Sequence, residues 1–585
     1  MLKYERILNE RKEKTMKKLL SVFLVTLMLF AVMAPAASAV ETATFQSGKT
    51  PIIYIRGNGE QIYEADGVTP ITATFEDFGL EGDASDAETG LDKDTIVETA
   101  VNILKPFILE GMIFDEWDNY GKVLYEEISP LFKDAGLDHD GNPLNGTRVG
   151  VAELAKSEAT AASRWNYDIN EAYQFCYDWR LSPYDNVEKL HTYVQTIMSA
   201  TGASQVSFYG RCLGGSLMSV YIDEYGKYGH IKNVMFSDVL SNESTFISKA
   251  FSGQIEFDAT LVERYTGQLD YCGKNLPNAV GFSFSDLLYE IVFKSMSFFN
   301  QIGATDAALD GVEELYARLY KALVPALCHA IGFATQVNNW TCVAEEDMDT
   351  ALDLMFGVEG TETREMYAGL IAKIEKYRTN ISRDLTGFYD RAQENGINVG
   401  FLGKYGYLNA PITVGADLLS DSLVSLEHAT MGATCAKIGQ TLSDDYIAAR
   451  VAEGNGKYIS PDKMVDLSTC CAPDKTWVFK NAHHNISPEI ISVIKAFLNG
   501  DYETVDSVQA KYGFSQFNVY FDETKTFTEM TEENCADLPF MDLAVEEPTE
   551  ESIFVAALRW FTMLFKVISM LLNGEISFGE AKEML

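Results

Sequence analysis

Basic residues are scarce in this chain. Lysine and arginine together number 46, against 85 aspartates and glutamates, which gives the 585 residues a formal net charge of -39. Nucleic acids and anionic membrane surfaces would repel such a protein, so neither is expected as a partner. The excess of carboxylates is typical of a solvated acidic surface.

Signatures of cofactor chemistry are missing as well. No group of residues has the spacing of a metal site, and no glycine-rich loop ends in the Lys-Ser/Thr pair that binds phosphates. We therefore expect neither a metal nor another cofactor. Histidine is also rare, with seven in the chain, which leaves few candidates for a general base.

The N-terminal 39 residues predict a secretory signal peptide preceded by a leader extension. A positively charged start at 16–18 is followed by an apolar run at 19–33 and by the small-x-small cleavage pattern Ala-Ser-Ala at 37–39. No cysteine follows that pattern, which argues against a lipoprotein anchor. The expected location is extracellular. There, nine cysteines could form four disulfides and leave Cys212 as a free thiol.

The stretch 206–217, Val-Ser-Phe-Tyr-Gly-Arg-Cys-Leu-Gly-Gly-Ser-Leu, carries the strongest chemical signal. A β-prone run reaches Gly-x-Cys-x-Gly-Gly, and a helix-compatible run follows. Strand, tight turn and helix in this order predict a nucleophile elbow with Cys212 at its tip. The N–H of Leu213 would then donate to an oxyanion. The alternative is a buried cysteine at an ordinary glycine-rich junction.

Strand and helix patterns alternate around this elbow. Short apolar runs at 51–55, 172–180 and 231–236, with an amphipathic helix at 186–200, predict an α/β fold with a mostly parallel sheet. The loop after the first strand, Arg-Gly-Asn-Gly at 56–59, predicts the second oxyanion contact. Gly57 would allow a close approach of the backbone, and Asn58 is the best placed donor.

Tyr-Asp-Trp-Arg-Leu-Ser-Pro at 177–183, a helix, and then the elbow box together resemble the lecithin:cholesterol acyltransferase-like, lipase-like branch of the α/β-hydrolases. The resemblance implies an α/β-hydrolase fold and chemistry on acyl esters. Those enzymes carry serine where this chain has Cys212. The box also resembles that of polyhydroxyalkanoate synthases, which are intracellular and use cysteine. The signal peptide and the 177–183 motif argue against that second family.

The resemblance also implies an acid in a turn that follows a late strand. A strand pattern at 397–405 precedes Ser-Asp-Ser-Leu-Val-Ser at 420–425, so Asp421 is the candidate. Asp417 and Asp466 are rivals in this acidic chain.

The resemblance places the general base between the last predicted strand, at 476–480, and a helix that begins around Pro488, and the family's spacing to that proline favours His484. His484 is the candidate there, with His483 as the alternative base. The chain order Cys212, Asp421, His484 is the nucleophile-acid-histidine order of α/β-hydrolases.

These patterns divide the chain into six segments. The signal peptide at 1–39 is followed by a first core part at 40–241, a helical cap insertion at 242–395 and a second core part at 396–519. An acidic linker at 520–551 and an amphipathic helix at 552–585 complete the chain. Two charges interrupt the apolar part of that helix at 552–573, which favours peripheral membrane contact, protein contact or docking on its own domain over a membrane span.

The sequence thus predicts a secreted enzyme that cleaves or transfers acyl groups of small-molecule or lipid-like esters. A Cys-His-Asp triad would act through an acyl-thioester. Two alternatives remain open: a non-catalytic relative that binds a lipid or a protein partner, and a thioesterase or amidase with the same triad.

Overall fold

The computed structural model describes seven parts of the chain: 50–57, 62–71, 117–149, 172–254, seven residues within 261–272, 321–484 and 488–541. Residues 68, 70, 131, 133, 240–242, 322, 410–413, 501–503, 522–523, 536 and 539–540 are not among them. The expected signal peptide at 1–39 and C-terminal helix at 552–585 lie outside the described residues. The same is true of Asn58.

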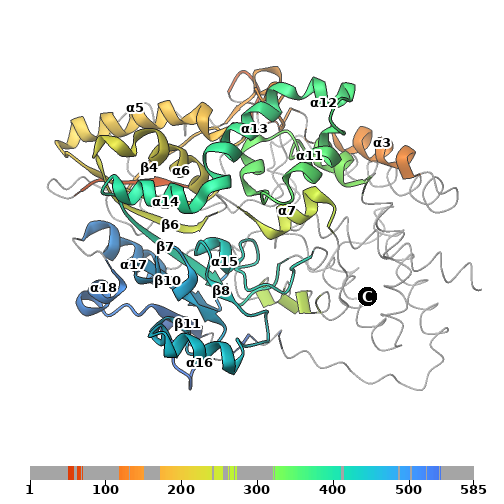
Figure 1. Ribbon diagram of the computed structural model, residues 1–585. Coiled ribbons are helices and arrows are strands. Elements are labelled where there is room, and N and C mark those ends of the chain that lie inside the picture. Colours follow the sequence, from red (N-terminus) through yellow and green to blue (C-terminus); the bar gives the residue numbers. More distant parts are fainter. Residues whose placement is uncertain are drawn as a thin grey trace, which may run out of the picture.

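A sheet of eight strands forms the centre of the described structure (Figure 1). Its order is β12-β11-β10-β7-β6-β5-β1-β4, and all neighbours are parallel except β11 and β12. The predicted α/β class with a mostly parallel sheet is confirmed. The strands are β1 (Ile52–Ile55), β4 (Ala172–Phe175), β5 (Val206–Cys212), β6 (Ile231–Val239), β7 (Asn398–Tyr405), β10 (Thr476–Lys480), β11 (Phe517–Phe521) and β12 (Thr526–Glu529).

Helices cover both faces of the sheet, because successive strand side chains point to opposite sides and both sides are apolar. On β1, Ile53 and Ile55 belong to one core cluster, whereas Ile52 and Tyr54 belong to another. Helices α5 (Pro183–Thr201), α6 (Gly214–Tyr225) and α14 (Leu385–Glu394) pack in the first cluster, and α17 (Pro488–Asn499) and α18 (Val505–Tyr512) in the second.

A second group of helices packs around its own apolar cluster, in which Trp340 is fully buried. Helix α3 joins this cluster although its sequence lies in the segment expected to belong to the core at 40–241. Conversely, α14 lies within the expected cap at 242–395 but packs against the sheet. The helices of this group are α3 (Trp117–Ile128), α7 (Thr245–Ser252), α11 (Met348–Phe356) and α13 (Ala368–Asn380), and the short helix α12 (Glu362–Met366) connects α11 to α13 without burying a residue.

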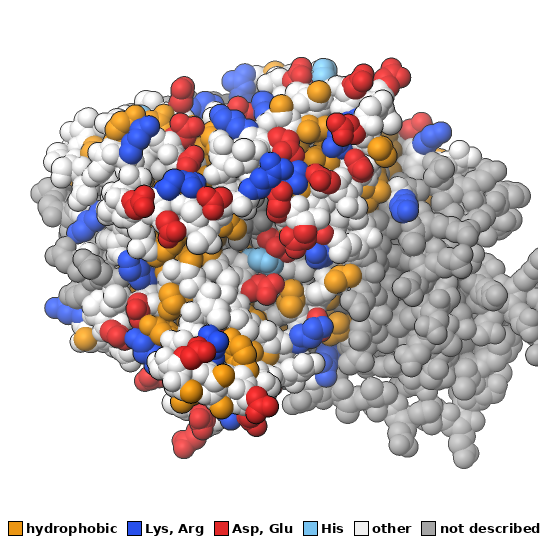
Figure 2. Space-filling view, in the orientation of Figure 1, with side chains coloured by type: hydrophobic (Ala, Val, Ile, Leu, Met, Phe, Trp, Pro, Cys, Tyr) orange, Lys and Arg blue, Asp and Glu red, His pale blue; other side chains and the backbone are white. Residues whose placement is uncertain are grey.

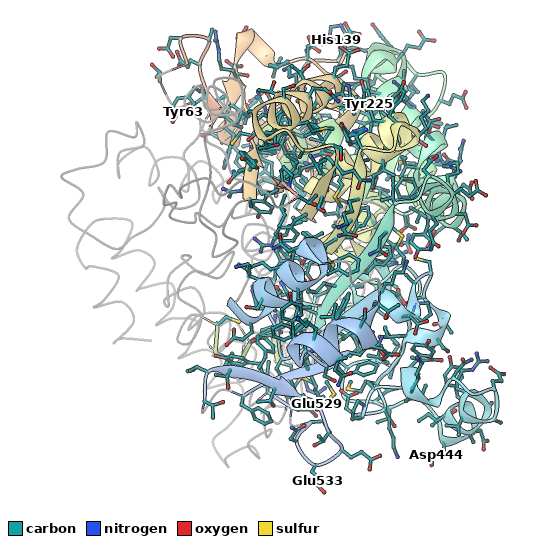
Figure 3. The ribbon with its side chains drawn as sticks, turned by 90° about the vertical axis from the view of Figure 1, so that its left-hand side faces the viewer. Tyr63, His139, Tyr225, Asp444, Glu529 and Glu533 are labelled. Carbon is teal, nitrogen blue, oxygen red and sulfur yellow. The ribbon has the colours of Figure 1, made fainter. Side chains whose placement is uncertain are left out.

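The acidic stretch that was expected to be a linker at 520–551 begins inside the sheet. Residues Phe521 and Thr526 pair at the antiparallel β11–β12 hairpin, which forms one edge of the sheet. Alternating apolar residues allow this stretch to pair despite its charge. In Figure 3, Glu529 and Glu533 mark this edge, at the opposite end of the molecule from Tyr63 and His139.

The 177–183 motif forms a buried turn rather than the end of a strand, because β4 ends at Phe175. Arg180 is fully buried and donates two hydrogen bonds to the Asp178 carboxylate, at 2.9 and 2.7 Å. It also donates to Thr147 Oγ1 at 3.1 Å. The motif therefore ties β4 to the segment before it.

Short elements complete the described chain, and acidic and basic side chains are interspersed on the surface that Figure 2 shows. Residues 138–142 form a turn, with the Asp138 N–H donating to Asn142 O at 2.7 Å. The short elements are β2 (Ile62–Tyr63), β3 (Arg148–Val149), β8 (Thr434–Cys435), β9 (Val465–Asp466), α15 (Leu426–Ala429), α16 (Asp444–Ala452), and 3-10 turns at Leu144–Gly146, Gly226–Tyr228, Val337–Cys342, Ser382–Asp384, Gly456–Tyr458, Leu467–Thr469 and Pro473–Lys475.

Candidate active site

Cys212 lies at the sharp turn between β5 and α6. Its φ of +54° is in the left-handed region, which non-glycine residues seldom adopt and which is typical of functional turns. The glycines around it are required by close packing. A Cβ on Gly214 would lie 2.2 Å from the carbonyl oxygen of Ile55, and one on Gly215 would lie 2.5 Å from the Val239 side chain.

Gly57 faces the cysteine from the end of β1. A Cβ on Gly57 would lie 3.0 Å from Cys212 Sγ and 3.2 Å from the backbone nitrogen of Leu213. The backbone N–H of Leu213 also helps to lower the pKa of the Cys212 thiol. Two of the three residues expected at an oxyanion site, Gly57 and Leu213, thus lie beside the thiol, and the third, Asn58, lies outside the described residues.

His484 and Asp421 lie next to the thiol. The imidazole Nδ1 donates to Asp421 Oδ2 at 2.7 Å, and the ring lies next to the Cys212 thiol, so that each of the two groups shifts the pKa of the other. The backbone N–H of His484 also donates to the Asp421 carbonyl at 2.9 Å. The structure therefore brings together three side chains from positions 212, 421 and 484 as one connected chain of contacts.

The electrostatics of this cluster favour its charged form. Burial lowers the pKa of His484, but Asp421 and Cys212 outweigh burial and raise that pKa to about 9. Burial likewise opposes ionisation of Asp421, yet the charge and hydrogen bond of His484 lower the pKa of Asp421 to about 2. Burial raises the pKa of Cys212, and the contacts with His484, followed by the charge of Arg211, bring that pKa below its ordinary value.

The alternative base, His483, does not contact the thiol in this way. Its Nε2 shares a hydrogen bond of 2.9 Å with Ser422 Oγ, and its ring packs edge-on against Tyr407. Burial is the main reason that the pKa of His483 falls to about 3, so this imidazole is neutral.

The rival acids lie in other interactions. Asp417 forms an ion pair with Lys437 at 2.7 Å. Asp466 accepts hydrogen bonds from the hydroxyl of Tyr446 and the N–H of Ser468, both at 2.8 Å. Neither is the carboxylate that accepts from Nδ1 of His484.

All nine cysteines are free thiols, so the odd number does not result from four disulfides and one unpaired nucleophile. Cys342 is fully buried in the small apolar cluster against which Cys212 packs. Burial raises the pKa of Cys342 well above its ordinary value. The pKa values of these two neighbouring thiols are therefore shifted in opposite directions, that of Cys212 downwards and that of Cys342 upwards.

Three charged residues of the site were not predicted from the sequence. Arg211 donates to the carbonyl oxygen of His484, and Lys404 Nζ donates to the same oxygen at 3.3 Å. Lys404 also forms an ion pair with Asp238 at 2.6 Å, and both side chains of that pair are fully buried. A sequence signal was present, since opposite charges end two apolar strand runs, at Phe-Ser-Asp (236–238) and Gly-Lys-Tyr (403–405).

A residue of the 177–183 motif forms a hydrogen bond with the loop after β1. The Tyr177 hydroxyl donates to the carbonyl oxygen of Arg56 at 3.0 Å, and Tyr177 is almost fully buried. This hydrogen bond holds the residue that precedes Gly57.

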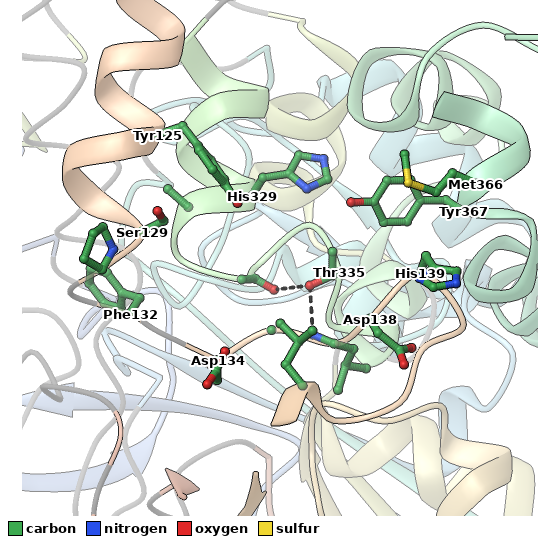
Figure 4. Close-up of a pocket in the computed structure, with 16 residues that line it drawn as sticks. Tyr125, Ser129, Phe132, Asp134, Asp138, His139, His329, Thr335, Met366 and Tyr367 are labelled. Carbon is green, nitrogen blue, oxygen red and sulfur yellow. Dashed lines mark hydrogen bonds between the residues drawn. The ribbon is translucent and has the colours of Figure 1, made fainter. Parts of the chain in front are cut away.

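A separate cavity of about 470 Å³ lies among the helices around Trp340 (Figure 4). Aromatic rings, two carboxylates and two histidines line it, and they include Tyr125, Asp134, Asp138, His139, His329 and Tyr367. Thr335 also lines the cavity, and its Oγ1 accepts from Leu137 N and donates to Gly332 O. None of the residues that line the cavity belongs to the Cys212 cluster, so the cavity is separate from the candidate active site.

No family model matches the chain, and no curated protein matches it either. Within the described parts of the chain, no helix is long and apolar enough to cross a membrane. The same residues hold no group of three or more His, Cys, Asp or Glu side chains arranged to bind a metal ion.

Proposed function

We propose that this protein is an α/β-hydrolase that attacks acyl esters with a cysteine nucleophile, and that it is secreted. The observation that carries the proposal is the continuous contact from the strained Cys212 through the ring of His484 to Asp421. A nucleophile, a base that touches it and an acid that orients the base are the parts that covalent acyl chemistry requires.

The raised pKa of His484 and the lowered pKa of Cys212 favour a thiolate–imidazolium pair before substrate binds. The thiolate attacks the acyl carbon and forms a tetrahedral oxyanion. His484 then gives its proton to the departing alkoxide, so an alcohol leaves and an acyl-thioester remains. Asp421 stays ionised throughout, and its negative charge stabilises the imidazolium form of His484.

The second half of the reaction uses the neutral imidazole. His484 removes a proton from water or from another acceptor, and the acceptor attacks the thioester carbonyl. The Cys212 sulfur departs as thiolate and the imidazolium is restored. Each oxyanion donor, of which the Leu213 N–H is one, contributes about 3 kcal/mol in this type of chemistry.

Apolar side chains beside the thiol support an acyl group as the part of the substrate that is recognised. Ile247 and Leu423 pack with Cys212 against the same small cluster. Such surroundings favour a hydrocarbon chain over a charged group.

The proposal is tested with p-nitrophenyl esters of increasing chain length and with iodoacetamide at neutral pH. We expect ester cleavage that Cys212→Ala abolishes. We also expect Cys212 to be alkylated much faster than a free thiol, and His484→Ala to remove that excess rate.

Cys435→Ala is the matched control, because Cys435 is also a partly buried free thiol but lies outside the cluster. It should leave both ester cleavage and the fast alkylation unchanged. Alkylation of Cys212 at the rate of a free thiol, together with no ester cleavage, would contradict the proposal and favour the non-catalytic binding protein.

A further inference from the structure

Two cations, the fully buried Lys404 and the partly buried Arg211, hold the backbone of the proposed base. The carbonyl oxygen of His484 accepts hydrogen bonds from Arg211, at the end of β5, and from Lys404, at the end of β7. Because both donors project from central strands, they fix the position of His484 relative to the sheet that carries Cys212.

Lys404 is itself held by Asp238 at the end of the neighbouring strand β6. The two side chains are 2.6 Å apart, and neither is accessible to solvent. Asp238 has a φ of +46°, and one of its oxygens, Oδ1, has no hydrogen-bond partner. A strained backbone and an incompletely paired carboxylate are costly in a protein interior, which suggests that the arrangement serves function and not stability alone.

We propose that Lys404, paired with Asp238, is a positioning residue for His484 and supplies the positive field that favours a thiolate at Cys212. This inference rests on the function proposed above. The ammonium group acts in two ways: its hydrogen bond fixes the backbone of the base, and its charge lies close to the ionising cluster. Asp238 limits the second effect, because its negative charge partly cancels that of Lys404.

Other charged and titratable groups face the cluster from the surrounding elements. Arg211 lies on β5, Asp421 and His483 lie on the loops after β7 and β10, and Cys342 lies on the 3-10 turn at 337–342. The substitutions below leave the identity of these groups unchanged, so the contribution of the Lys404–Asp238 pair can be tested on its own.

The test measures the rate of Cys212 alkylation by iodoacetamide against pH in the full-length protein. Lys404→Met removes a positive charge and one of the two donors to the His484 carbonyl. It should raise the apparent pKa of the thiol by about one unit. Asp238→Asn keeps Lys404 charged and hydrogen-bonded to His484, so it should shift the same pKa in the opposite direction.

The chain offers a matched control in Lys480→Met. Lys480 lies near the end of the next strand, β10, and pairs with Asp462 at 3.2 Å with both side chains almost fully buried. Its Nζ donates to the carbonyl of Cys535 and not to that of His484. Asp462 keeps the hydrogen bonds from the hydroxyls of Tyr405 and Ser460, so Lys480→Met removes a buried strand-end cation without touching His484, and the pKa of Cys212 should not change.

Opposite shifts in Lys404→Met and Asp238→Asn, with no shift in Lys480→Met, would establish the positioning role. Shifts in the same direction, or no shift in either variant, would overturn it. If Lys404→Met does not fold, the direction of the shift in Asp238→Asn decides alone. Ordinary alkylation of the unaltered protein would instead contradict the proposed function, so the two failures can be told apart.

Discussion

Gly57 packs so closely against Cys212 that no side chain would fit at position 57. A Cβ at position 57 would lie 2.8 Å from the Cβ of Cys212 and 3.0 Å from its sulfur. Real Cβ atoms do not approach other atoms so closely, and the same Cβ would lie 3.2 Å from the backbone nitrogen of Leu213. The space that glycine leaves open is therefore the space in which an oxyanion would contact Leu213.

Gly57→Ala should abolish most ester cleavage without unfolding the protein. The added methyl group would occupy the proposed oxyanion position, and loss of one such contact costs about a hundred-fold or more in rate. The measurement is kcat/KM for a short p-nitrophenyl ester.

Gly456→Ala is the control for this variant. Gly456 begins a 3-10 turn that is distant from Cys212 in the sequence and is not part of its cluster. A Cβ on Gly456 would lie 3.1 Å from a methyl group of Val451, which is close to the distances found at Gly57. It should leave kcat/KM within two-fold, and an equal loss in both variants would remove the oxyanion explanation.

Tyr177→Phe should reduce activity by loosening the loop that carries Gly57. The phenol of Tyr177 donates to the Arg56 carbonyl, and Phe would leave that buried carbonyl without this donor at a cost of about 1 kcal/mol. Tyr193→Phe is a close match, since its hydroxyl donates to the backbone carbonyl of Gln174 at 2.9 Å. Urea unfolding should show similar losses of stability for both variants, whereas kcat/KM should fall only for Tyr177→Phe. A fall in both would mean that the effect is general destabilisation.

The parts of the structure that follow from local patterns could be predicted from the sequence. Buried parallel strands appear as continuous apolar runs, and the elbow at Cys212 combines such a run with glycines and a helix. The positions of Asp421 and His484 were also predicted, but only through the resemblance, because 63 residues separate them and no local pattern links them.

Other parts depended on pairings between distant residues. The base is His484 or His483 depending on which ring faces Cys212. The two histidines are adjacent and have the same sequence surroundings, so the sequence alone does not distinguish them. In the sequence, Lys404 and Asp238 are two charged residues near the ends of separate strands. Only the pairing of β6 with β7 brings them together. The β11–β12 hairpin was missed because its charge content outweighed its alternating pattern.

Arg180→Met should destabilise the whole protein by about 3–5 kcal/mol. The guanidinium is fully buried, and its removal would leave the Asp178 carboxylate without its two hydrogen bonds in the interior. Arg364→Met serves as the comparison, because the Arg364–Asp353 pair spans 3.5 Å and its carboxylate is half exposed. Removing that pair should change the free energy of unfolding by no more than about 1 kcal/mol. Similar losses for the two variants would show that the buried turn at 177–183 does not depend on its ion pair.

The pH dependence of the acylation rate should be set by two ionisations, that of the Cys212 thiol and that of the His484 imidazolium. The rate should rise as Cys212 ionises, at a pH below the ordinary thiol pKa of about 8.5. It should fall again as His484 loses its proton near pH 9, because the neutral ring has no proton for the departing alkoxide.

An alkyl ester is needed to see that alkaline fall, since p-nitrophenolate leaves without a proton. Asp421→Asn removes the charge that raises the pKa of His484, so the alkaline limb should move to lower pH while the protein stays folded. His483→Gln should leave the limb in place, because His483 is already neutral over this range. An alkaline limb that follows His483 and ignores Asp421 would mean that the wrong imidazole has been assigned as the base.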